Sequence, residues 1–158
     1  YGNLCQRVFS FLKKNCDNKI PKAKNFSDVD NKLINNLKDS IPKLIDLINK
    51  QDLNDYIKIV VNFSFEANKY FNDSEPWKLK KENPERMNTI LFCIIEQIKN
   101  ISILLYPIIP LSTMKIFETI NFSKNQISIE NILKKNILNH EKDLNSLDIL
   151  FKKIEDDN

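Results

Sequence analysis

The sequence predicts an all-α domain, an antiparallel bundle of about five helices followed by a C-terminal tail. Five stretches carry apolar residues at every third or fourth position, which is the spacing of one helix face. The connections between them are short, and short loops make successive helices run antiparallel. One glycine among 158 residues, with 42% hydrophobic and 28% charged residues, is typical of one folded helical domain that needs no disulfide or metal.

A first helix is predicted from the start of the chain to about Asp17. Leu4, Val8 and Leu12 form its apolar stripe. Its separate polar stripe consists of Asn3, Arg7, Ser10 and Lys14. Asn18 can adopt the left-handed conformation that ends a helix. Because the chain enters this helix without an initiator methionine, we expect it to be part of a longer protein.

A second helix is predicted to begin at Ser27, whose hydroxyl can cap it, and to run to about Ile48. Proline inside a helix removes one backbone donor and crowds the preceding turn. Pro42 therefore predicts a kink or break near Ser40.

A third helix is predicted to begin after the cap Asp52 and to end before the turn-forming run Asp73–Pro76. Trp77 follows at once, so we expect its ring at the lip of a loop. Asn83 followed by Pro84 is a typical helix start, and it predicts a long fourth helix that Pro107 ends.

A fifth helix is predicted over residues 111–119, capped by Ser112 or Thr113, and the pattern weakens over 121–140 to another turn or two. We expect residues 1–143 to form the helical domain and 144–158 a tail. That tail is expected to pack on the bundle or on a missing part of the protein, because its apolar side chains would be costly to leave in water. Those side chains are Leu147, Ile149, Leu150 and Phe151.

Charge and composition limit the classes of partner. A net charge of +3, from 24 basic and 21 acidic residues, is too even for a protein that holds nucleic acid by charge alone, so any RNA contact must be local. Cys5, Cys16 and Cys93 are scattered, which predicts reduced buried thiols in a cytoplasmic protein. The apolar run Ile101–Leu111 is too short to cross a bilayer, so no membrane partner is expected.

No catalytic residue or metal ligand is predicted. His140 is the only histidine, and beside Glu141 in a polar region it is expected to be solvated. The cysteines lack metal-site spacing, and Gly2 alone cannot form a glycine-rich phosphate loop. Four carboxylates could be imagined in pairs, but single carboxylates on helices usually mark a solvated face. They are Glu66, Glu75, Glu85 and Glu96.

Three polar or aromatic residues suit an unpaired nucleobase. Asn3 and Arg7 stand four residues apart on one helix face and can reach the same object. Asparagine offers a donor and an acceptor, arginine offers a rigid fork of donors, and the Trp77 ring offers a stacking surface. In the alternative interpretation, Arg7 forms an ion pair with another helix, Asn3 caps a turn and Trp77 fills the bundle end. Residue chemistry by itself favours this structural interpretation.

Several motifs, in order, resemble the anticodon-binding domain of methionyl-tRNA synthetases. They are Gly2-Asn3-Leu4-x-x-Arg7, Ala67-Asn68-Lys69-Tyr70-Phe71, Glu75-Pro76-Trp77-Lys78-Leu79-Lys80, the proline-bounded Ile103–Pro110 and the closing Leu150–Glu155. The resemblance spans nearly the whole chain. Asn18 stands where this family often has glycine, and residues 121–143 diverge.

The resemblance implies that Asn3, Arg7, Pro76 and Trp77 contact the CAU anticodon, with Trp77 stacking beneath the wobble cytosine and Pro76 holding the ring's approach. It implies a parent ligase that joins methionine to its tRNA. ATP and a zinc knuckle would belong to the catalytic half of that ligase, and no cofactor to this segment. The implied partners are methionine tRNA and the protein's own N-terminal catalytic domain, with neither DNA nor a membrane among them.

Two alternatives remain open. The first is the related anticodon domain of a valine, isoleucine, leucine or cysteine enzyme, which has a similar Asn-x-x-x-Arg start; the placement of Pro76 and Trp77 favours methionine. The second is a non-enzymatic helical module that docks on protein through Trp77.

Overall fold

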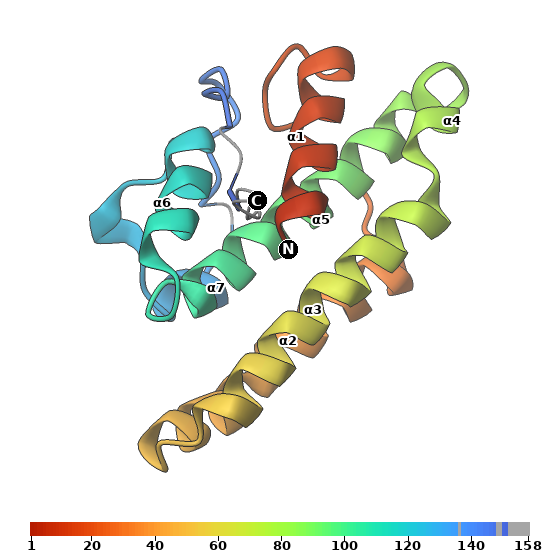
Figure 1. Cartoon of the computed structure of the whole chain (residues 1–158). Helices are drawn as coiled ribbons and strands as arrows, with labels where there is room; N and C mark the ends of the chain where they lie inside the picture. Colours follow the sequence, from red (N-terminus) through yellow and green to blue (C-terminus); the bar gives the residue numbers. More distant parts are fainter. Residues whose placement is uncertain (136, 148–149, 152–158) are drawn as a thin grey trace, which may run out of the picture.

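The structure is a computed structural model, and it describes residues 1–135, 137–147 and 150–151 (Figure 1). Within these ranges all regular structure is helical, which confirms the predicted fold class. The helices are α1 (Gly2–Asn15), α2 (Asp28–Asn49), α3 (Leu53–Ser74), α4 (Pro76–Glu82), α5 (Pro84–Leu105), α6 (Pro110–Thr119), the 3₁₀ turn η1 (Lys124–Gln126) and α7 (Glu130–Leu133).

Helix α5 is the centre of the molecule. Each of the other α-helices packs against it, and in Figure 1 it runs diagonally through the fold. Its 22 residues are long and apolar enough to cross a bilayer, but 94% of its apolar stretch is buried inside the protein. A core helix with apolar residues on all sides has this composition, so α5 is explained by the protein interior that surrounds it.

Helices α2 and α3 form a hairpin along one side of α5 (Figure 1). Ser27 caps α2 through a reciprocal capping box with Asp30, as its sequence position predicts. The helix does not break near Ser40, because α2 is one helix from Asp28 to Asn49 with Pro42 inside it. A kink at this position stays a prediction. The Ser40 hydroxyl donates to the Leu37 carbonyl at 2.6 Å, one turn before the proline.

The predicted loop position of Trp77 is also wrong. Helix α3 continues to Ser74, and after the single left-handed residue Glu75 (φ 45°) the chain enters the short helix α4, in which Trp77 is the second residue. Pro76 explains this start, because its fixed φ suits the first helical position. The predicted cap of the next helix is confirmed, since the Asn83 side chain accepts from the Arg86 amide at 3.1 Å.

Helix α6 begins earlier than predicted and without either predicted cap. Ile109 is the N-cap, Pro110 is the first helical residue, and the Thr113 hydroxyl donates back to the Ile109 carbonyl at 3.0 Å. In the tail, Leu144 and Leu150 are buried against the bundle, and the Asn145 amide donates to the Thr119 carbonyl at 3.0 Å. Ile149 lies outside the described residues.

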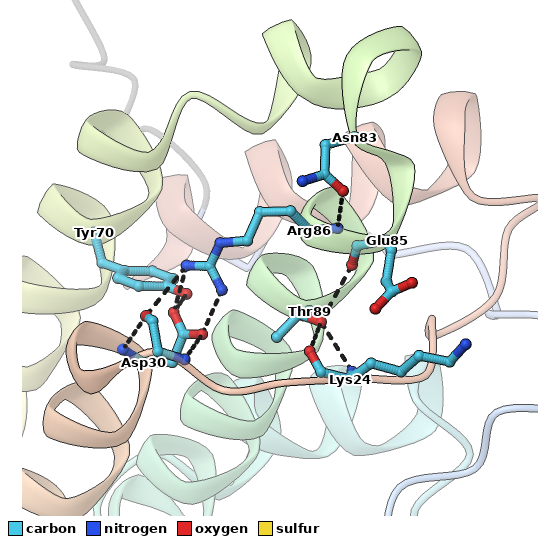
Figure 2. A network of polar contacts seen from close by, with 8 residues as sticks. Lys24, Asp30, Tyr70, Asn83, Glu85, Arg86 and Thr89 are labelled. Atoms are coloured by element: carbon cyan, nitrogen blue, oxygen red, sulfur yellow. Dashed lines mark hydrogen bonds and ion pairs between the residues drawn. The ribbon is translucent and has the colours of Figure 1, made fainter.

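A buried carboxylate joins the hairpin to α5 (Figure 2). Asp30 is fully buried and receives both Arg86 terminal nitrogens, at 2.5 and 2.8 Å, and the Tyr70 hydroxyl at 2.5 Å. Burial acts to raise the pKa of Asp30, but the hydrogen bonds from Arg86, Tyr70 and Ser27 outweigh it and lower the pKa to about 2. The carboxylate therefore stays charged and links α2, α3 and α5.

The connection between α1 and α2 is attached to α5 close by. The Thr89 hydroxyl donates to the Lys24 carbonyl at 2.7 Å and accepts from the Lys24 amide at 2.9 Å (Figure 2). These two bonds satisfy the backbone carbonyl and amide of Lys24, which lies outside any helix and so has no helical hydrogen bonds.

Glu96 is not on a solvated face, contrary to the prediction. It is 5% exposed and accepts from the fully buried Lys99 ammonium at 2.7 Å. Lys99 also donates to the Asn131 carbonyl at 2.9 Å, which ties α7 to α5. Burial lowers the pKa of Lys99, because the charged form loses its hydration there.

Candidate nucleic-acid interface

The Arg7 guanidinium lies where α1 meets α3. One terminal nitrogen donates to the Asn68 side-chain oxygen at 2.8 Å and the other to the Asn72 side-chain oxygen at 2.8 Å. Asn68 and Asn72 are four residues apart on α3, so their side chains stand one above the other on one face. Together they hold the planar fork at both tips.

Arg7 also lies over an aromatic ring. Its guanidinium carbon is 4.9 Å from the centre of the Phe71 ring, which is cation–π distance. The Phe11 ring meets Phe71 edge-on at 6.2 Å, and the Trp77 ring does so at 5.6 Å. Phe71 therefore supports both Arg7 and Trp77, and brings these two predicted residues to one place.

Trp77 remains accessible in this cluster, with 45% of its surface exposed. Pro76 beside it is buried, so the backbone that carries the indole is anchored in the bundle while the ring faces outward. The turn is further held by Lys78, which donates to both oxygens of Glu75 at 3.0 Å.

Asn3 lies exposed one helical turn before Arg7, on the same face of α1. Within the part of the chain that the structure describes, its side chain makes no hydrogen bond. It lines a hollow of about 250 Å³ together with Tyr1 and the tail residue Phe151. Asn3 thus stands beside the Arg7 cluster and does not cap a turn.

The structure also contradicts the alternative roles of Arg7, as an ion-pair partner of another helix, and of Trp77, as a residue that fills the bundle end. Arg7 does contact a neighbouring helix, but through neutral amides; among the described residues, no carboxylate lies within ion-pair distance of it. Trp77 covers an edge of Phe71 and leaves nearly half its surface in solvent, so it does not fill the bundle end.

Three residues of this cluster had no site role predicted from the sequence: Asn68 and Phe71, which lie within one of the family motifs, and Asn72. All three lie on α3 at spacings of three and four residues, which places them on one face. Two asparagines on the same helix face as a phenylalanine could have indicated a binding site for an arginine side chain, because the amide oxygens accept from a guanidinium and the ring can lie beneath it. What the sequence could not supply was that α1 lies against this face of α3.

The local electrostatics leave the arginine charge uncompensated. The acidic neighbours at the α3–α4 junction are each paired with a lysine of the same region: Asp73 with Lys69 at 2.5 Å, and Glu75 with Lys78 at 3.0 Å. The amides on Arg7 carry no charge. The cluster is therefore a locally positive, aromatic surface on a chain of modest net charge.

Of the three cysteines predicted to be buried, Cys5 and Cys93 are buried, whereas Cys16 is half-buried, so the prediction is wrong for Cys16. Burial raises the pKa of Cys5 to about 12 and that of Cys93 to about 12, so both thiols are protonated and weak nucleophiles at neutral pH. His140 stacks on Phe92 at 5.7 Å, and its Nδ1 lies 3.0 Å from the Ile20 carbonyl, so the prediction of a solvated histidine is wrong. Among the described residues, no three side chains of histidine, cysteine or acids are placed to hold a metal.

Known structures share this fold. The apo methionyl-tRNA synthetase of Mycobacterium tuberculosis superposes with a TM-score of 0.88 at 24% identity, over 97% of this chain and 31% of that one. A structure of the same protein in complex with methionyl-adenylate gives 0.87 at 25% identity, over 96% of this chain and 30% of that one.

Sequence comparison shows the same relationship. The methionine–tRNA ligase of Rickettsia felis is 29% identical over 99% of this chain, and that of Bacteroides fragilis 30% over 99%. The chain spans only 31% and 23% of these two proteins. Residues 20–158 match the family described as the anticodon binding domain of methionyl tRNA ligase. Because this match covers most of its length, the chain belongs to the family of methionyl-tRNA ligase anticodon-binding domains.

Proposed function

We propose that this chain recognises the CAU anticodon of methionine tRNA, as the C-terminal domain of an enzyme that ligates methionine to that tRNA. The observation that carries the proposal is the cluster of Arg7, Phe71 and exposed Trp77 in a chain of this family. Protein recognition of RNA sequence mostly targets single-stranded loops, whose unstacked bases expose both their faces and their edges.

Trp77 supplies the stacking surface. A base stacked on an aromatic side chain contributes about 1 to 3 kcal/mol, and the 45% exposed indole offers such a surface without rearrangement of the core. Phe71 supports the ring from the side and Pro76 anchors its backbone. In the proposed complex the unpaired wobble cytosine stacks on Trp77.

Arg7 and Asn3 supply the polar contacts to base edges. Arginine has five N–H donors, of which the Asn68 and Asn72 bonds use two. The remaining donors can bind base oxygens and ring nitrogens, and Asn3 adds a donor and an acceptor one turn away. Recognition by a few local contacts also agrees with the modest net charge of +3.

The chemistry of the parent enzyme belongs to a part of the protein outside this chain. We propose that this part activates methionine with ATP, and that the present domain binds the far end of the tRNA and so places its acceptor end. The M. tuberculosis relative bound to methionyl-adenylate supports ATP use in such a parent. The catalytic half and methionine tRNA are then the two partners of this domain, in the cytoplasm.

The test uses Trp77, the only tryptophan of the chain, as its probe. The 158-residue chain is titrated with an RNA hairpin that carries CAU in its loop, and separately with hairpins of the same stem and a changed anticodon. Quenching of Trp77 emission with a clear preference for CAU is the expected result.

The same titration distinguishes the alternatives. Preference for a valine, isoleucine, leucine or cysteine anticodon would replace the methionine assignment. Weak binding to every hairpin without preference would overturn RNA recognition and favour the protein-docking alternative.

A further inference from the structure

We propose that Asn68 and Asn72 are positioning residues for anticodon recognition, which set the base preference of Arg7 while leaving its charge uncompensated. The inference rests on the proposed function of Arg7 and names the residues that make it selective. Neither asparagine belongs to the set predicted to contact RNA.

The first step is the orientation of the two amides. A guanidinium group has donors only, so an asparagine bonded to it must turn its oxygen toward it. Both 2.8 Å bonds from Arg7 therefore fix the Asn68 and Asn72 oxygens toward Arg7 and their amino groups away from it. The bonds to Arg7 are therefore enough to orient the Asn68 and Asn72 amide groups, and no further hydrogen-bond partner is needed.

The second step is the restraint on Arg7. An exposed arginine samples many rotamers, and fixing it costs conformational entropy when it binds a base. Here two acceptors at the tips of the fork and the Phe71 face beneath it hold the guanidinium in one plane before RNA arrives. Binding energy is then available for discrimination between bases, which is the general benefit of preorganisation.

The third step is the neutrality of the two acceptors. Carboxylates at positions 68 and 72 would hold Arg7 equally well but would cancel its attraction for RNA. The nearby acids Asp73 and Glu75 are already paired with Lys69 and Lys78. Amides at these positions therefore orient the arginine without removing the charge that attracts the anticodon loop.

The experiment is a mutant cycle on the 158-residue chain, read as affinity for the CAU hairpin and for a hairpin with a changed anticodon. The double variant Asn68→Ala/Asn72→Ala is expected to lower the preference for CAU by about tenfold. This fold-change lies within the range of base discrimination that one bidentate arginine contact provides. In the Arg7→Ala background the same two changes are expected to have no further effect, because they act through Arg7.

Two variants that each add one negative charge to α3, near Arg7 and far from it, test the role of the neutral amides. Asn72→Asp keeps an acceptor for Arg7 but adds a negative charge, and we expect weaker binding to both hairpins with a shallower salt dependence. Asn54→Asp adds the same charge about 27 Å away along α3, at an exposed position, and should leave affinity nearly unchanged. Thermal melts followed by circular dichroism verify that each variant is folded.

Two results would overturn the inference. One is an unchanged CAU preference in the double variant while Arg7→Ala loses it. The other is an equal loss from the asparagine changes with and without Arg7, which would make them direct RNA contacts. A wild-type chain that shows no CAU preference would instead overturn the proposed function itself, so the two failures are distinguishable.

Discussion

At the scale of single residues, Trp77 combines exposure with support. Its ring is 45% exposed, yet it packs on the edge of Phe71 and follows a buried proline. An indole on a mobile loop would have to be ordered on binding, whereas this one already has a defined position on α4. Its removal therefore tests stacking rather than folding.

For Trp77→Ala we expect the affinity for the CAU hairpin to fall by about 1 to 3 kcal/mol, which is about 5- to 150-fold. In the proposed parent ligase the same change should slow tRNA charging and leave ATP-dependent methionine activation nearly unchanged. Hairpin titration and the two activity assays measure these effects. Trp77→Phe is the control, because it keeps an aromatic face; unaltered charging in the alanine variant would contradict the stacking role.

For Arg7→Lys we expect loss of the preference for CAU although the positive charge is kept. A lysine ammonium cannot reproduce the planar fork that spans Asn68 and Asn72. The measurement is the ratio of affinities for cognate and changed hairpins. If Arg7→Lys and Arg7→Ala both weaken all hairpins equally, Arg7 contacts phosphate and not a base edge.

At the scale of helices, the Asp30 cluster joins the α2–α3 hairpin to α5 through one carboxylate. Arg86 donates to the carboxylate from both terminal nitrogens and Tyr70 from its hydroxyl (Figure 2). The Ser27 backbone N–H donates to it as well, at 2.9 Å, so each partner comes from a different helix or cap. Removal of one partner leaves the others desolvated and unpaired, which is why such clusters respond strongly to single changes.

The cluster makes the free energy of unfolding depend on pH in the acid range. The pKa of Asp30 falls from its ordinary 3.8 to about 2 on folding. A lowered pKa contributes stability that is fully present above about pH 4 and is lost as pH falls through about 2, by about 1 to 2 kcal/mol after allowance for partial exposure of Arg86. Urea unfolding at several pH values measures this dependence.

Asp30→Asn is the matched variant for that experiment. It should remove the Asp30 component of the acid dependence and lower the free energy of unfolding at pH 7 by about 3 kcal/mol, because Arg86 loses its charged partner. An acid dependence equal to that of the wild type would show that other carboxylates cause it.

At the scale of the whole molecule, α5 connects the other described α-helices into one packed bundle. Every other α-helix packs on it, and the buried pair Glu96–Lys99 ties it to α7 through the Asn131 carbonyl. One oxygen of Glu96 has no hydrogen-bond partner, so the pair is incompletely satisfied. A half-satisfied buried pair contributes little net stability but is costly to break from one side.

We therefore expect Lys99→Ala to lower the free energy of unfolding by about 3 to 5 kcal/mol. The double change Glu96→Leu/Lys99→Met should be nearly neutral or stabilising, because it removes both charges and keeps the volume. Urea unfolding of both variants provides the measurement. If the double variant is as unstable as Lys99→Ala, the Glu96–Lys99 pair itself contributes net stability to the fold, and apolar residues of similar volume cannot replace it.

Local signals in the sequence determined most of the helices. The caps at Ser27 and Asn83 and the left-handed conformation of Asn18 (φ 55°) are confirmed, since each depends only on a few neighbouring residues. Helix α1 itself ends at Asn15, and Asp17 (φ 52°) is the first left-handed residue after it. The polar stripe that holds Asn3 and Arg7 is exposed as predicted, because helical periodicity decides it. Contact of Asn3, Arg7, Pro76 and Trp77 with RNA stays a prediction.

Only the tertiary structure decided which side chains are buried and which helices meet, because the hydrophobic periodicity of one helix does not contain this information. The continuous α2 contains Pro42, and the seven-residue α4 packs against α5 with Pro76 buried. Glu96 and Lys99 are buried because α5 is surrounded on all sides, and Asn68 and Asn72 hold Arg7 because α1 lies across α3. Hydrophobic spacing and capping act within one turn or two of helix, whereas the surroundings of a side chain depend on which helices meet there.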